Sequence, residues 1–76
     1  MNKQRRKEIA KALDTLADAL AILQQVKEDE ETAFESLPES LQASEKGELM
    51  ETAISNLDEG ISVIEDAIES LTLAME

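Results

Sequence analysis

The sequence predicts an all-α protein: an antiparallel two-helix hairpin, coiled-coil-like, that dimerises into a four-helix bundle. Three observations predict this fold. Apolar residues recur at alternating spacings of four and three in both halves of the chain, which is the period of an amphipathic helix. The central stretch FESLPESLQASEKGE, residues 34–48, interrupts that period with the only Pro and one of the two Gly. The 76 residues form a single domain with a small core, which a second copy is expected to complete.

The first expected helix covers about residues 3–36. Its apolar stripe occupies positions a and d of a heptad lettered a to g, with Leu13 at a: Ile9, Leu13, Leu16, Leu20 and Leu23. Position g carries Ala12, Ala19, Val26 and Ala33. Lys27 and Glu30 interrupt the stripe, which resumes at Phe34. We expect both charged side chains to extend from the seam toward water and to fix the register of the pair.

The second expected helix covers about residues 44–75, and its stripe has no interruption. The a and d positions are Met50, Ile54, Leu57, Ile61, Ile64, Ile68, Leu71 and Met75. Position g is again small: Ala53, Gly60, Ala67 and Ala74. In an antiparallel pair, stripe residues whose numbers sum to 84 meet in layers, as Leu20 and Ile64 do. The small residues flanking the seam are expected to let the two backbones approach closely.

Residues 37–43 form the expected elbow. Pro38 disfavours helical backbone at Leu37 and ends the first helix, while Ser44 is a favourable cap for the second. The segment PESLQ is expected to make one short turn, with Leu37 and Leu41 covering that end of the hairpin. The alternative fold, one continuous rod that pairs with another chain, requires a helix through Pro38.

Composition excludes several classes of function. The chain holds 18 acids and 7 bases, a net charge of −11, and it has neither Cys nor His. We therefore expect no zinc or haem site, no cofactor and no enzyme active site, and a cytoplasmic location. The run EDEE, residues 28–31, is interpreted as a solvated helix face because consecutive helical residues point in different directions. No apolar run is long enough to cross a membrane.

Charge is distributed unevenly along the chain. Residues 1–11 carry a net +4, whereas residues 12–76 carry a net −15. An acidic body repels nucleic acid, so no direct nucleic-acid binding is expected. The basic segment KQRRK, residues 3–7, could be a nucleic-acid arm, but charge balance against Glu69 and Glu76 is the favoured interpretation.

Two sets of residues are candidate contact sites. The candidate surface for a basic partner protein is a row of acids: Asp58, Glu65, Asp66 and Glu69. The candidate contacts with a second copy lie off the seam: Ile22, Val63, Ala17 and Ala21.

The stretch from Ala33 to Leu71 carries a resemblance. Its pattern LPESLQ.SE.GE.ME, followed by repeated AI..L.E.I, resembles small acidic proteins of Firmicutes bacteria and their phages. The hairpin shape is also similar to plasmid-encoded RNA-binding hairpins that dimerise into four-helix bundles, although those bind through basic faces. The first resemblance implies a phage or prophage setting and nothing catalytic. Together with the acidic charge, it makes plausible a protein that docks on a basic or nucleic-acid-binding host protein, as a nucleic-acid mimic or inhibitor of host defence. The alternative is a structural module that acts by homo-oligomerisation.

Overall fold

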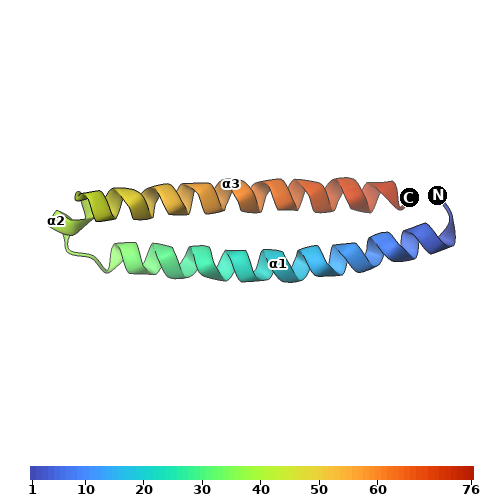
Figure 1. Cartoon of the computed structure of the whole chain (residues 1–76), viewed down its shortest axis with the longest axis horizontal. Coiled ribbons are helices and arrows are strands. Elements are labelled where there is room, and N and C mark those ends of the chain that lie inside the picture. Colours follow the sequence, from blue (N-terminus) through green and yellow to red (C-terminus); the bar gives the residue numbers. More distant parts are fainter.

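Two long antiparallel helices joined by a short elbow make up the protein (Figure 1). The computed structural model describes residues 1–76, with helix α1 at Lys3–Glu35, the one-turn helix α2 at Glu39–Gln42 and helix α3 at Glu45–Ala74. Both termini lie at one end of the rod and α2 lies at the other. The molecule measures 58 × 15 × 13 Å, so it is only two helices wide. The all-helical class is confirmed, and the continuous-rod alternative is wrong because the chain turns back after Glu35.

Each long helix begins at a side-chain cap. Asn2 Oδ1 accepts a hydrogen bond from the backbone N–H of Arg5 at 2.8 Å, and Ser44 Oγ accepts one from the N–H of Gly47 at 3.5 Å. These caps satisfy N–H groups that the first turn of a helix leaves without partners. The expected cap at Ser44 is thereby confirmed, and α1 begins at Lys3 because Asn2 caps it.

Helix α1 ends at Glu35, three residues before Pro38. The carbonyls at the end of a helix have no partners within it. The half-buried Gln42 side chain supplies a hydrogen-bond donor here. Its Nε2 donates to the carbonyl of Phe34 at 3.2 Å and to that of Leu37 at 3.0 Å. A residue of α2 thus closes the end of α1, which the sequence analysis does not predict.

Gly47 fixes how the elbow rests on α3. It is buried, and a Cβ at this position would lie 2.0 Å from the carbonyl oxygen of Gln42 and 2.7 Å from that of Leu41. The backbone of α2 can lie against the first turn of α3 only because residue 47 has no side chain. Leu37 is half-buried as expected, whereas Leu41 is 43% exposed. The expectation that both leucines cover this end is therefore wrong for Leu41, because backbone occupies that place.

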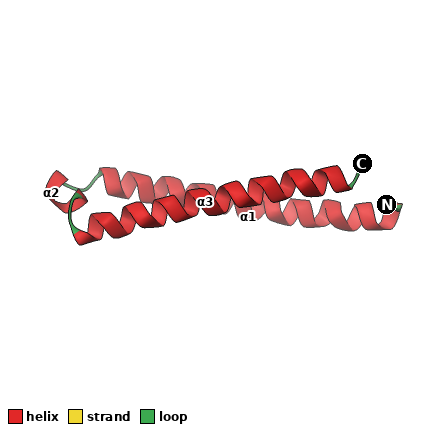
Figure 2. Ribbon diagram, turned by 90° about the horizontal axis from the view of Figure 1, so that it is seen from above, coloured by secondary structure: helices red, strands yellow, loops and turns green.

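The seam between α1 and α3 follows the predicted stripe. From Ile9 to Phe34 and from Met50 to Met75, every a and d side chain is at least half-buried, while most other positions are exposed. The two helices cross at a shallow angle, as coiled-coil packing requires (Figure 2). Ile61, 6% exposed, is nevertheless the only buried apolar residue. Two helices cover only one stripe of each other, so the core is thin.

The small residues at position g were expected to let the two backbones approach closely, but several of them are exposed. Ala12 and Ala74 are exposed, and nothing lies within 4 Å of the place a Cβ would take at Gly60. The helices meet through the larger a and d side chains, which leaves position g at the edge of the seam. Ala19, Ala53 and Ala67 are half-buried beside the seam, whereas the rest of the row lies on an open side of the hairpin.

Candidate functional site: an acidic groove beside the elbow

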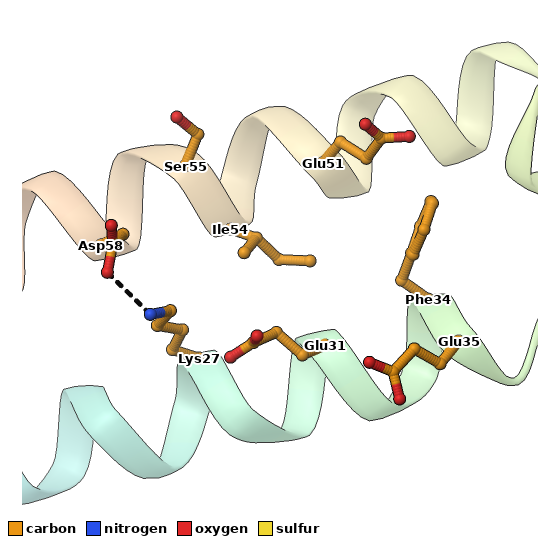
Figure 3. Close-up of a pocket in the computed structure, with 8 residues that line it drawn as sticks. All are labelled: Lys27, Glu31, Phe34, Glu35, Glu51, Ile54, Ser55 and Asp58. Carbon is orange, nitrogen blue, oxygen red and sulfur yellow. Dashed lines mark hydrogen bonds and ion pairs between the residues drawn. The ribbon is translucent and has the colours of Figure 1, made fainter.

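A groove of about 430 Å³ opens between α1 and α3 near the elbow (Figure 3). Four residues from each helix line it: Lys27, Glu31, Phe34, Glu35, Glu51, Ile54, Ser55 and Asp58. Its two apolar members, Phe34 and Ile54, project into the space between the helices. Carboxylates from both helices surround them, so the groove combines an apolar floor with an acidic rim.

The groove lies where the stripe of α1 is interrupted. In most layers of the seam, two apolar side chains face each other and close the space between the helices. Beside Ile54 and Leu57, the corresponding positions of α1 hold Glu30 and Lys27, which are charged residues in place of apolar ones. This part of the seam therefore lacks the apolar volume that closes it elsewhere, and a groove remains.

Lys27 forms an ion pair across the groove. Its Nζ lies 2.7 Å from Asp58 Oδ1, which is the only ion pair within 4.0 Å in the molecule. The hydrogen bond to Asp58 raises the pKa of the Lys27 ammonium above its usual value of 10.5, and the negative charge of Asp58, Glu31 and Glu65 acts in the same direction. Lys27 thus leaves the seam as expected, and its charge is held at one wall of the groove. Glu30 stays half-buried at the seam.

The remaining carboxylates of the groove have no cationic partner. Glu31, Glu35 and Glu51 make no ion pair, so the lining holds four acids and one base. Rigid helices hold these charges in place before any partner arrives. Such an arrangement attracts cations and raises the association rate of a basic partner.

The structure divides the predicted acidic row. Asp58 lines the groove, whereas Glu65, Asp66 and Glu69 lie exposed along α3 beyond it, toward the open end. Glu65 follows Asp58 by one heptad and shares its side of the helix. Glu31 and Phe34 are not among the site residues predicted from the sequence. The interruption of the stripe at Lys27 and Glu30 is the signal that could have located them.

Charge also differs between the two broad sides of the hairpin. In an antiparallel pair, positions e and b of both helices lie on one side of the seam. Between residues 10 and 35 and between 48 and 72, this side holds nine acids and no base: Asp14, Glu28, Glu31, Glu35, Glu48, Glu51, Asp58, Glu65 and Glu69. We call it the acidic face, and the groove opens on it.

The opposite side, made of positions g and c, is nearly free of charge. Between residues 12 and 33 and between 49 and 74, its single charged residue is Asp29, whose carboxylate accepts a hydrogen bond from Gln25 Nε2 at 2.9 Å. The other residues there are small, apolar or uncharged polar: Ala12, Thr15, Ala19, Ile22, Val26, Ala33, Leu49, Ala53, Asn56, Gly60, Val63, Ala67, Ser70 and Ala74. We call this side the neutral face.

The four predicted contacts with a second copy fall on different sides. Ile22 and Val63, which are 64% and 61% exposed, share the neutral face. Ala17 and Ala21 precede Glu31 and Glu35 by two heptads and therefore lie on the acidic face. The structure thus brings together two of the four residues and separates the other two from them.

The basic amino-terminal segment lies against the end of α3. Arg6 Nε donates to the backbone carbonyl of Met75 at 2.8 Å, which places a cation at the negative end of the helix dipole. Neither Glu69 nor Glu76 makes an ion pair with this segment. Its favourable contact is therefore with helix carbonyls and not with the carboxylates that the sequence analysis names.

The structure brings no three metal-ligating side chains close enough together to hold an ion. None of its helices combines the length and the apolar character that crossing a membrane requires. No family model, curated protein or solved structure matches the chain.

Proposed function

We propose that this protein is a small, non-enzymatic binding module that holds a basic segment of a partner protein in its acidic groove. The groove carries this proposal, because it joins the apolar floor of Phe34 and Ile54 to an acidic rim in which only Asp58 is paired with a cation. The side chains of lysine and arginine are complementary to such a groove, because each has an aliphatic stem that packs on apolar surface and a cation at its end. Phe34 also offers an aromatic face to such a cation.

The resemblance to small acidic phage proteins supports a more specific setting for this module. In that setting, the partner is a nucleic-acid-binding host protein, and the acidic face takes the place of the phosphate backbone in its basic cleft. The protein then acts as a nucleic-acid mimic or inhibitor of host defence. Nine acids on one rigid face, against the single base Lys27 in the groove, support this extension of the proposal.

A charge-matched comparison tests the groove with an arginine-rich peptide as the probe. The triple variant Glu31→Gln, Glu35→Gln, Glu51→Gln removes three groove charges. The control Asp18→Asn, Glu45→Gln, Glu59→Gln removes three charges outside both the groove and the acidic face. We expect the groove variant to weaken peptide binding by more than about tenfold and the control by about twofold, measured by calorimetry at fixed salt. Equal losses in both variants would mean that only net charge matters and that the groove is not the site.

The ion pair provides a test in the opposite direction. Lys27→Met removes the only base of the groove and leaves Asp58 free to bind a cation. We expect the peptide to bind more tightly to this variant, whereas Lys46→Met, which makes the same charge change outside the groove, has a smaller effect. Tighter binding to both variants by the same factor would contradict a groove-specific site.

A second candidate function is assembly through self-association into a four-helix bundle. The thin core and the neutral face support it, because a lone hairpin leaves apolar side chains uncovered. Light scattering that reports about twice the 8.4 kDa chain mass would support this function, and a monomer at all concentrations would exclude it.

A further inference from the structure

The exposed apolar residues of the hairpin are concentrated on its neutral face. Four of the seven large exposed apolar residues belong to it: Ile22, Val26, Leu49 and Val63. Between them run the small residues of position g, and nothing lies within 4 Å of the place a Cβ would take at Gly60. A surface with both projecting and recessed apolar positions can interlock with another surface of the same kind.

A second copy of this chain has the right size and charge for that face. The broad side of the rod that carries the neutral face is 58 Å long and 13–15 Å wide. Its footprint is about 800 Å², comparable to the area that each partner of a standard stable interface buries. Two molecules that each carry a charge of −11 repel each other strongly. Contact through the neutral faces keeps both acidic faces pointing outward and so minimises that repulsion.

The charge along the rod decides how the two copies are oriented. The open end, residues 1–13 and 71–76, holds five bases and two acids, a net charge of +3. The elbow end, residues 25–59, holds eleven acids and two bases, a net charge of −9. Placing the elbows at the same end would bring the two most acidic regions together. Placing them at opposite ends brings each basic end beside an acidic one.

We infer that two hairpins pack through their neutral faces with their elbows at opposite ends, related by a two-fold axis across the middle of the rod. This inference deepens the assembly function proposed above and does not depend on the binding of a basic partner. Ile22 and Val63 lie near mid-length, so the axis passes close to both. The resulting four-helix bundle displays an acidic groove on each outer side, one near each end.

Charge placed on the neutral face tests the interface. Ile22→Glu and Val63→Glu each bury a carboxylate against the second copy, whereas the control Leu73→Glu adds the same charge at a 58% exposed site outside that face. We expect light scattering to report the monomer mass of 8.4 kDa for both neutral-face variants and the dimer mass for the control. If Ile22→Glu and Val63→Glu lose helix while Leu73→Glu stays helical, the result also supports this interface, because the control shows that an added charge elsewhere is tolerated. A dimer in all three variants, or a monomeric natural protein, would overturn the inference.

A distance between elbows tests the orientation. Ser40→Cys places a single thiol on α2, because the chain has no other cysteine, and a spin label there reports the separation of the two elbows. We expect a separation close to the 58 Å length of the rod. A separation comparable to its 13–15 Å width would overturn the proposed orientation. Both measurements use the protein without a basic partner, so their failure is distinct from failure of the groove proposal.

Discussion

The two halves of the seam are built from the same heptads, yet they have different properties. Toward the open end, each layer joins two apolar side chains, and Ile61 at its inner limit is the only buried residue of the apolar core. Toward the elbow, Lys27 and Glu30 replace two apolar positions, and a groove of about 430 Å³ opens between the same two helices. The difference indicates that the open half stabilises the hairpin, whereas the elbow half is less well packed and exposes a charged surface.

The largest expected effect contrasts two isoleucines at position a of α3, one heptad apart. Ile61→Ala removes the only buried apolar side chain and should cost about 3 kcal/mol of unfolding free energy. Ile54→Ala lies at the open groove and should cost about 1 kcal/mol, because solvent already reaches its surroundings. Urea unfolding followed by circular dichroism at one protein concentration measures both. Equal losses would show that the two halves are packed equally well.

The two glycines provide the next contrast, with effects of opposite sign. Gly47→Ala forces a methyl group against the α2 backbone and should destabilise the protein by about 2 kcal/mol. Gly60→Ala adds its methyl group to open space in a helix and should stabilise by about 1 kcal/mol. Alanine is already the usual residue of the g row, so it also suits the neutral face. Stabilisation by both substitutions would contradict the close approach of elbow and α3.

The amide of Gln42 gives a smaller effect at the elbow. Gln42→Ala leaves the carbonyls of Phe34 and Leu37 without this donor and should cost about 1 kcal/mol. The control is Gln25→Ala, which loses an exposed hydrogen bond to Asp29 within one helix and should cost about 0.3 kcal/mol. Thermal unfolding of the two variants compares them directly, and a larger loss for Gln25→Ala would show that Gln42 does not close α1.

The smallest expected effect concerns the ion pair of Lys27 and its dependence on pH. Lys27→Met places an apolar residue in the stripe and should stabilise the hairpin slightly at neutral pH. Because folding raises the pKa of Lys27, the stability from its pair is fully present below its usual value of 10.5. It is lost as the pH rises through the raised folded pKa. The advantage of Lys27→Met should therefore be constant near neutral pH and grow only above pH 10.5, as measured by urea unfolding. Growth between neutral pH and about pH 9 would contradict the assignment.

The sequence by itself determined the parts of this protein that depend on local spacing. The 4-3 period of apolar residues located both stripes, and Pro38 and Ser44 bounded the elbow to within about a residue. These features could be predicted because helix periodicity, proline geometry and capping act over only a few residues.

Tertiary structure alone decided what lies across the seam or across the elbow. Only the packed hairpin shows that Gln42 closes α1, that Gly47 admits the α2 backbone, and that Gly60 of the g row faces open space. It also separates Ile22 and Val63 from Ala17 and Ala21, which the sequence analysis had grouped because each is apolar and off the stripe. Such relations depend on which residues of two distant segments become neighbours. Which residues become neighbours depends on how the helices cross and on the volume of the side chains between them. The periodicity of a single helix gives no information on either.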